Sequence, residues 1–442
     1  MAMGNVNKKT ENTSASVRSQ GLLGLYAMIL LLASVPSKFI FYLIGPVSLL
    51  VTFVLKGYWR WKHLVVYVFF GVLALTSIML EPYPSLFSLL LWPVTYGTFV
   101  VLFAFLVFPI RVFPSESTMQ RAAQIATYWI GVQGIVGVVQ YLLSGNTDAV
   151  AGTVGLLDLR GNITINQVYF GFAVLSLVPA VWFAPYRLRY RWASLAVSLI
   201  AVAFSQSGHG TVAFVMAFTF VYLASDVRPR ALAMAGVVIV LLGSATLVVY
   251  PNIVTVSKIW LKRSMNPDSP KALMVKELWS GYATDAKLLF LGSGPGQYVS
   301  RAALIGSGLL THFKTELQKV PRRTEESFLP VLQHYYQIGE GSAIAKPYNS
   351  FVSLYAENGV FVATLVVIAL VGVMLTNLYR ANTFDEEQRY LRRYVAFYVL
   401  FLLLVSLVEL YFEMPAAIAP GGWLAIMAVA RSRYLLRAAR GA

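Results

Sequence analysis

Two polar segments of an otherwise apolar chain hold residues whose types and spacing could do chemistry. One is a glycine-rich turn, Gly292-Ser-Gly-Pro-Gly-Gln-Tyr298, and the other is Pro347-Tyr-Asn-Ser-Phe-Val-Ser-Leu-Tyr-Ala-Glu-Asn-Gly359, which leads into an apolar stretch. The backbone N–H groups around Gly294 could bind a phosphate group, although the same residues also suit a plain turn. If the protein does chemistry, we expect it where these two segments meet.

Arginine is the cation that best fits phosphate oxygens, because its planar guanidinium can donate two parallel hydrogen bonds. Arg160 lies alone just before an apolar run, and Arg301 follows the glycine turn. Arg322 and Arg323 form a pair beside two glutamates. Each could bind phosphate, but simpler roles are open. Arg160 could be an interfacial side chain, Arg301 could belong to a solvated loop helix, and the pair could be a surface charge cluster.

Two aromatic residues with polar atoms are further candidates. His209 lies in a glycine turn of residues 205–210, and an ionisable residue near membrane depth is a functional hypothesis by default; a structural histidine is the alternative. Tyr348 could position a hydroxyl or stack on a sugar, or it could belong to the tyrosine belt of a membrane interface. An unperturbed tyrosine has a pKa of about 10, so Tyr348 is a poor base unless a cation such as Lys346 lies against it.

Three more side chains complete the set of candidate acids, bases and ligands. Glu357 could act as a base, or it could be a structural carboxylate that pairs with a loop cation. His334 precedes Tyr348 closely enough to serve as a base. Glu409, with Glu413 close behind it, could bind a sugar or an arginine. No residues have the spacing of a metal site, so we expect a metal-independent site without a cofactor.

The composition is that of a membrane protein. Hydrophobic residues make up 58% of the 442 residues and charged residues 12%, whereas soluble domains carry about 25% charge. Cysteine is absent, which excludes disulfides, thiolate metal sites and a cysteine nucleophile. The net charge of +16 could indicate nucleic-acid binding, but in a membrane protein it indicates basic cytoplasmic loops. We therefore expect membrane lipids, and no nucleic acid, as partners.

Twelve apolar runs are candidate membrane helices, since a bilayer core of roughly 30 Å needs about 20 residues per helix. They cover residues 21–35, 39–55, 64–80, 86–108, 122–143, 163–184, 192–206, 211–224, 231–250, 350–378, 394–411 and 421–436. Runs seven and eight are short and could form two helices or a re-entrant hairpin. We therefore expect an all-α polytopic fold, with helices 1–9 in residues 21–250 and helices 10–12 in residues 348–436.

The positive charges predict the orientation of the chain. Every even-numbered connection is rich in Lys and Arg, whereas the short odd-numbered ones hold only Lys38 and Arg160. Because basic loops stay in the cytoplasm, we expect both termini there and residues 251–347 outside it. Residues 1–20 and 437–442 are then cytoplasmic tails, and the polar composition of the first predicts disorder.

Residues 251–347 form the one long polar interval, with twelve Lys or Arg against seven Asp or Glu. A helix is predicted over residues 268–279, because acceptor side chains precede it and a proline occupies its first turn. Residues 292–296 predict a turn, and residues 300–318 could form a second helix. No strand pattern is convincing, so we expect a small helical extracytoplasmic cap.

The order of these segments resembles that of the bacterial O-antigen ligase and polymerase family of integral-membrane glycosyltransferases. The features that carry the resemblance are the glycine turn of residues 292–298, the polar loop after it, and the loop-to-helix segment with Tyr348, Asn349 and Glu357. The family carries a long outer loop late in a chain of about twelve helices, which agrees with the topology that the charges predict.

Two further segments carry the resemblance, and two positions depart from it. Leu159-Arg-Gly-Asn-Ile-Thr-Ile-Asn-Gln167 is similar to a family segment in which an Arg is followed by an Asn, here Asn166, that enters a helix. Residues 205–211 lie where the family usually has a Ser-Arg-Gly turn, but here the Arg is missing and His209 lies nearby. The family's ligases place a His where this chain has Tyr348.

The resemblance implies a metal-independent glycosyltransferase on the outer face of a bacterial inner membrane. Its donor would be an oligosaccharide linked to undecaprenyl or another polyprenyl diphosphate, whose leaving group needs cations, and a base would help the acceptor hydroxyl. The catalytic candidates are Tyr348, His334 and Glu357. The candidates for substrate binding are Arg160, Asn166, His209, Gly294, Arg301, Arg322, Arg323, Asn349 and Glu409.

The acceptor decides the activity. Another lipid-linked repeat makes the protein an O-antigen or surface-polysaccharide polymerase, the lipid A core makes it a ligase, and a protein makes it an O-oligosaccharyltransferase. Tyr348 in place of the ligase-like His favours a polymerase, for which a chain-length regulator would be a partner. A transporter or flippase for lipid-linked glycans is the rival from another class, and a non-catalytic assembly partner is a third.

Overall fold

The computed structural model of the chain describes residues 3–35, 40–54, 61–155, 164–225, 236, 266–309, 316–337, 346–381 and 385–441. Within these ranges the fold is all-helical and has no β-strand, as the sequence predicts. Each apolar run overlaps a helix except the ninth, residues 231–250, which lies almost wholly outside the described residues. These helices are α1 (Met3–Leu32), α2 (Ile44–Val54), α3 (Trp61–Met79), α4 (Leu86–Val107), α5 (Glu116–Ser144), α6 (Thr164–Trp182), α7 (Arg191–Ser205), α8 (Gly208–Ser225), α15 (Ser350–Ala381), α16 (Glu386–Ser406) and α17 (Pro415–Gly441).

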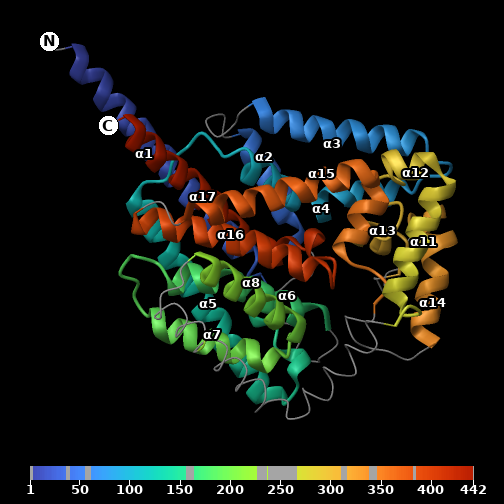
Figure 1. Ribbon diagram of the computed structural model, residues 1–442. Coiled ribbons are helices and arrows are strands. Elements are labelled where there is room, and N and C mark those ends of the chain that lie inside the picture. Colours follow the sequence, from blue (N-terminus) through green and yellow to red (C-terminus); the bar gives the residue numbers. More distant parts are fainter. Residues whose placement is uncertain are drawn as a thin grey trace.

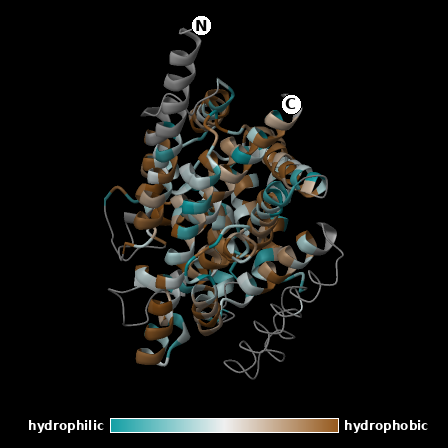
Figure 2. Cartoon of the chain, turned by 90° about the vertical axis from the view of Figure 1, so that its left-hand side faces the viewer, coloured by the Kyte–Doolittle hydropathy of each residue, from teal (hydrophilic) through white to brown (hydrophobic). Residues whose placement is uncertain are grey.

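Four of the described helices, α3, α4, α5 and α15, are long and apolar enough to cross a membrane. Their outward faces are apolar as well: α3 exposes Leu64, Val68 and Leu75, and α15 exposes Leu365 and Ile368. Figure 2 shows hydrophobic residues along most of the helices, including those at the periphery of the molecule. Because broad exposed apolar faces mark surfaces that contact lipid or another protein, and helices are the spanning elements that lipid allows, the chain is a membrane protein.

The ends of the described chain and the described part of the polar interval lie at opposite ends of the molecule (Figure 1). α1 and α17 bring both termini to one end. The other end carries short helices of the polar interval, which we call the cap: α11 (Pro270–Thr284), α12 (Ala286–Leu291), α13 (Arg301–Gly306) and α14 (Leu329–Gln337). The described part of the polar interval thus consists of short helices.

Local sequence signals set the cap helices. α11 begins where it is predicted, because the Ser269 side chain accepts a hydrogen bond from the helix backbone and Pro270 occupies the first turn. The helix expected over residues 300–318 is shorter in the structure. α13 ends at Gly306, and Gly308 then takes a positive φ of 78°, which a continuing helix does not allow.

The structure differs from the expectation at the start of the chain. Residues 3–20 belong to helix α1, whereas their polar composition predicts a disordered tail. Extending an existing helix is easier than starting one, and no proline interrupts residues 3–32. The helix of the first apolar run therefore continues outward to Met3.

Runs seven and eight form two separate short helices joined by a tight turn. α7 ends at Ser205 and α8 begins at Gly208, with Gln206 at a positive φ of 49° between them. α7 packs against α5 and α6, whereas α8 packs against α16 and α6. Both helices therefore contact α6, but their other neighbours differ. Because α8 begins at Gly208, His209 lies in its first turn.

Two apolar clusters hold the described helices together. The larger is rich in buried aromatic side chains from several membrane helices, such as Phe99, Phe172 and Trp423. The smaller joins cap residues to Tyr348, which lies just before α15, and to Val352 in its first turn. The cap is therefore packed onto the end of a membrane helix, where residues of both can share a site.

Candidate functional site

The glycine turn is wedged between the start of α4 and the first turns of α15. Gly292, Gly294 and Gly296 take positive φ angles of 75°, 99° and 72°, which favour glycine. A Cβ atom at Gly296 would lie 2.6 Å from the carbonyl oxygen of Ser88, and one at Gly292 would lie 2.3 Å from the carbonyl carbon of Glu357. Both the backbone conformation and the space require these glycines, and the predicted turn is confirmed.

Glu357 on α15 binds this turn through its carboxylate. Oε2 accepts a hydrogen bond from the N–H of Gly296 at 2.8 Å, and Oε1 accepts from the N–H groups of Ser300 at 3.2 Å and Tyr298 at 3.4 Å. The N–H of Gly294 donates to the backbone oxygen of Glu357 at 3.2 Å. Two expectations are thereby corrected. The N–H of Gly294 is engaged within the protein, and Glu357 pairs with backbone N–H groups instead of a loop cation.

Arg301 is buried at the junction of the cap and the membrane helices, with 6% of its surface exposed. Its Nε donates to the hydroxyl of Tyr42, and its Nη1 donates to the hydroxyl of Tyr169 at 3.0 Å. The guanidinium carbon lies 5.9 and 5.5 Å from the centres of these two rings, within cation–π range. Among the described residues, no carboxylate forms an ion pair with Arg301.

Glu413, in the 3-10 helix η5 (Tyr411–Glu413), holds the backbone of Arg301. Its carboxylate accepts hydrogen bonds from the N–H of Arg301 and from Oγ of Ser353, the latter at 2.7 Å. Burial, and after it the charge of Glu357, raise the pKa of Glu413 to about 8. The neutral form of Glu413 therefore prevails near neutral pH, so this residue fixes Arg301 in place without neutralising its guanidinium.

Tyr169 connects Arg301 with His209. The rings of Tyr169 and Tyr411 meet edge to face with their centres 5.5 Å apart, and the hydroxyl of Tyr411 lies 3.1 Å from Nε2 of His209. The Tyr411 hydroxyl also donates to the carbonyl oxygen of Val168 at 3.3 Å. His209 thus lies in the same cluster as Arg301, and one of its ring nitrogens is bound by a tyrosine.

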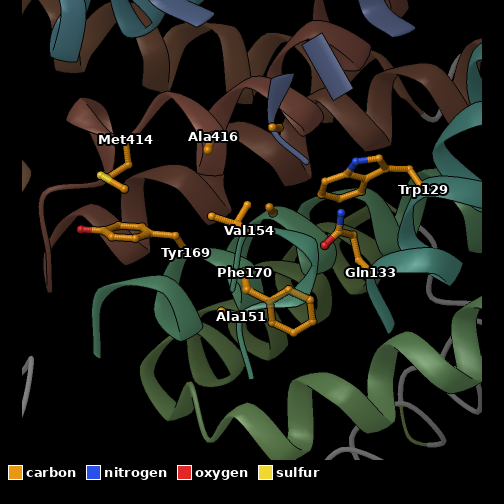
Figure 3. A pocket seen from close by; sticks show the side chains of 10 residues that line it. Trp129, Gln133, Ala151, Val154, Tyr169, Phe170, Met414 and Ala416 are labelled. Carbon is orange, nitrogen blue, oxygen red and sulfur yellow. The ribbon is translucent and has the colours of Figure 1, made fainter. Parts of the chain in front are cut away.

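A small cavity borders Tyr169 (Figure 3). It has a volume of about 30 Å³, and its lining is mostly apolar, with Gln133 and Trp129 among the larger side chains. In Figure 3 the hydroxyl of Tyr169 points away from the other labelled side chains. A cavity of this size holds about one or two water molecules, so it is too small to be a sugar site.

The loop before α15 brings Lys346, Tyr348 and Glu409 together. Nζ of Lys346 lies 3.2 Å from Oε2 of Glu409 and 5.7 Å from the centre of the Tyr348 ring. Burial, and after it the charge of Glu409, raise the pKa of Tyr348 well above its ordinary value, although Arg301 acts in the opposite direction. Tyr348 is therefore neutral near neutral pH, where its hydroxyl can donate a hydrogen bond but is no base. Glu409 pairs with a lysine, whereas the sequence suggests a sugar or an arginine.

Lys271 joins the cap to the same loop. Its ammonium group donates to the carbonyl oxygens of Lys346 at 2.9 Å, Tyr348 at 3.2 Å and Val408 at 2.7 Å. Burial lowers the pKa of Lys271 to about 8. The sequence around Lys271 does not predict this role, because a lysine in the first turn of a cap helix has the pattern of a solvated charge.

Three other candidates have structural contacts. Oδ1 of Asn349 accepts a hydrogen bond from the N–H of Val352 at 2.9 Å, so Asn349 caps the start of α15. Arg322 forms an exposed ion pair with Glu326 at 2.6 Å, and Arg323 pairs with a carboxylate at the start of α12. These contacts favour a surface charge cluster for the two arginines over phosphate binding.

The remaining candidates stay predictions. His334 is half-buried on α14 and forms no hydrogen bond with any residue that the structure describes. Arg160 lies outside the described residues. Asn166 lies on α6, but its side chain is outside the described part of the chain.

No protein-family model matches the chain, and no curated protein matches it. The family resemblance therefore rests on the motifs alone. Where the cap meets the membrane helices lies a buried guanidinium, that of Arg301, which pairs with no carboxylate of the described residues, and such a group can hold an anion.

Proposed function

We propose that the protein is a membrane glycosyltransferase that transfers or polymerises polyprenyl-diphosphate-linked glycan units on the outer face of a bacterial inner membrane. The observation that carries this proposal is the buried guanidinium of Arg301, which lacks a carboxylate partner among the described residues and lies between the cap and the membrane helices. A leaving diphosphate needs such a cation. A carrier lipid reaches its site from the bilayer, so the site must lie within a bundle of membrane helices.

The proposed reaction exchanges one bond of the sugar for another. The bond between the sugar C1 and the diphosphate oxygen breaks, and C1 bonds to the acceptor hydroxyl oxygen as that hydroxyl loses its proton. The diphosphate leaves with the bonding electrons, and Arg301 stabilises its charge, with Arg160 as a second arginine in the proposal. Because Glu357 is engaged by backbone N–H groups and Tyr348 is neutral, His334 is the remaining candidate base.

Twelve membrane-spanning helices, with both termini in the cytoplasm and the cap outside, are part of the proposal. The alternation of basic loops supports this orientation, and so does the separation of the termini from the cap (Figure 1). Among acceptors we favour another lipid-linked repeat, which makes the protein a surface-polysaccharide or O-antigen polymerase. Ligation to the lipid A core and transfer to a protein are the alternatives, and a flippase is the alternative from another class.

Transfer by the purified protein tests the proposal. The protein, in lipid nanodiscs, is given the lipid-linked oligosaccharides of its source cell, and product length is read on a gel. Arg301→Ala should lower the rate by about 10²- to 10³-fold, as the loss of a charge-stabilising group does. Arg301→Lys keeps the charge but loses the planar fork, so it should lose roughly 5- to 150-fold.

Arg322→Ala is the matched control, because Arg322 belongs to an exposed ion pair on the same cap, and it should transfer at the wild-type rate. A wild-type rate in Arg301→Ala, at equal amounts of folded protein, would remove Arg301 from the mechanism.

A further inference from the structure

Arg301 is a buried cation whose two side-chain partners among the described residues are both neutral. Nε donates to the hydroxyl of Tyr42 and Nη1 to that of Tyr169, and Nη2 forms no hydrogen bond with a described residue. Taking a cation out of water costs several kcal/mol unless a counter-charge accompanies it. An arginine with a purely structural role therefore gains most from a carboxylate, yet the two described side chains that bind the guanidinium of Arg301 are tyrosines.

Among the described residues, the nearby carboxylates form no ion pair with the guanidinium. Glu409 is paired with Lys346 at 3.2 Å. Glu357 accepts three backbone N–H groups of the segment that leads to Arg301. Glu413 binds the backbone of Arg301 and is neutral near neutral pH. Within the described ranges, no carboxylate is therefore left to pair with the guanidinium, which can bind an anionic ligand.

Tyrosine suits this arrangement better than a carboxylate does. The phenol oxygen of a tyrosine accepts an N–H hydrogen bond, and the tyrosine ring adds a cation–π contact. The two interactions together fix the plane of the guanidinium. A neutral hydroxyl does not cancel the charge that attracts an anion. The two tyrosines also come from separate elements, the 3-10 helix η1 (Ile40–Leu43) and α6, and thus hold Arg301 from two directions.

We propose that Tyr42 and Tyr169 are positioning residues that hold Arg301 as a preformed receptor for a phosphate-type anion, either a lipid diphosphate or a free diphosphate. The inference rests on the proposed role of Arg301, but it concerns binding and not transfer. Its test therefore measures binding to the full chain in nanodiscs of neutral lipid. Two probes distinguish the sources of the anion: inorganic pyrophosphate and farnesyl diphosphate.

Tyr42→Phe and Tyr169→Phe each remove one hydroxyl and keep the ring. Each should weaken the binding of both probes roughly 10-fold or more, the effect of losing a hydrogen bond to a charged group, and Arg301→Ala should abolish it. Tyr398→Phe is the matched control, because Tyr398 is also buried and donates to the carbonyl oxygen of Ile418 at 2.8 Å, away from Arg301. It should bind both probes as the wild type does.

A structural role would change the melting temperature of the Phe variants and leave the affinity of the folded fraction unchanged, so both quantities are measured. Wild-type affinity in both Phe variants, with binding lost in Arg301→Ala, would overturn the positioning role and leave the proposed function standing. Wild-type affinity in Arg301→Ala would overturn both. If Tyr169→Phe does not fold, Tyr42→Phe decides alone, because it removes the bond to a different N–H. Binding of farnesyl diphosphate but not pyrophosphate would assign the site to a lipid anion.

Discussion

The carboxylate of Glu357 and the backbone N–H of Gly296 are joined by a hydrogen bond of 2.8 Å that spans 61 residues of sequence. This bond fixes the glycine turn on the first turns of α15. Arg301 follows the turn directly, at the start of α13, so the same bond sets where the guanidinium lies. A carboxylate that resembles a catalytic base in the sequence is thus the anchor of the site.

We expect Glu357→Gln to damage folding more than the chemistry of the folded protein. The amide keeps the shape of the side chain but turns a donor toward a backbone N–H, which leaves a buried group unsatisfied at a cost of about 1–3 kcal/mol. The melting temperature in micelles should fall, while transfer per folded molecule should stay within a few-fold of wild type. A fully folded but inactive Glu357→Gln protein would indicate that Glu357 acts as a base.

Tyr348→Phe should reduce transfer without changing its dependence on pH. Burial raises the pKa of Tyr348 well above its ordinary value, so the phenol stays protonated across the neutral range and donates a hydrogen bond. Losing that donor should cost roughly 10-fold in rate. Rates of both proteins measured from about pH 6 to about pH 9 should give parallel profiles. A change of rate at high pH that only the wild type shows would indicate that the phenolate takes part.

Glu413 should make anion binding at Arg301 weaken as pH rises. Burial raises the pKa of Glu413 to about 8, so its carboxyl is neutral below that pH and ionises above it. The new negative charge beside Arg301 should weaken pyrophosphate binding roughly 10-fold between about pH 7 and about pH 9. Folding stability should fall as pH rises from the ordinary range of a carboxyl toward 8, because the unfolded chain releases this proton first.

Glu413→Gln is the control for this pH effect, since its amide cannot ionise. The protonation of pyrophosphate itself is the same in both experiments. The ratio of the dissociation constants of the wild type and Glu413→Gln at each pH therefore reports the ionisation of Glu413. A ratio that does not change with pH would contradict the prediction.

The orientation of the chain can be tested with reporter fusions. Alkaline phosphatase, which is active only outside the cytoplasm, should be active when fused after Lys287 in the cap and inactive when fused after Arg389 at the start of α16. The basic connections predict this result. The reverse pattern would place the cap in the cytoplasm and rule out a reaction on the outer face of the membrane.

The sequence predicts the helices well because lipid leaves the backbone few choices. A long apolar run must satisfy its own backbone hydrogen bonds and is therefore helical. α15 is helical on both sides of a kink at Gly359, where φ is 73°. The N-terminal residues 3–20 are helical for another reason. They are polar, but they extend the helix that the first apolar run forms. Local cap signals such as Ser269 also suffice to start α11.

The site is less predictable, because its partners come from distant segments. The residues that bind the side chain of Arg301 lie 259 and 132 positions away, at Tyr42 and Tyr169. Nothing in the sequence around either tyrosine indicates an arginine partner. In the same way, the types of Glu357 and Gly296 suggest chemistry, but only the fold shows that they bind each other.

Lys271 is synthesised well before the groups that it binds. The carbonyl oxygens of Lys346, Tyr348 and Val408 follow it by 75, 77 and 137 residues. On the proposed topology, α11 reaches the far side of the membrane while α15 and α16 are still being made, and its ammonium group stays hydrated until they are inserted. Chains fold in part as they are synthesised, so the docking of the cap is a late step of biogenesis. A nascent chain that has not yet passed Val408 therefore has no finished site with which to engage a carrier lipid.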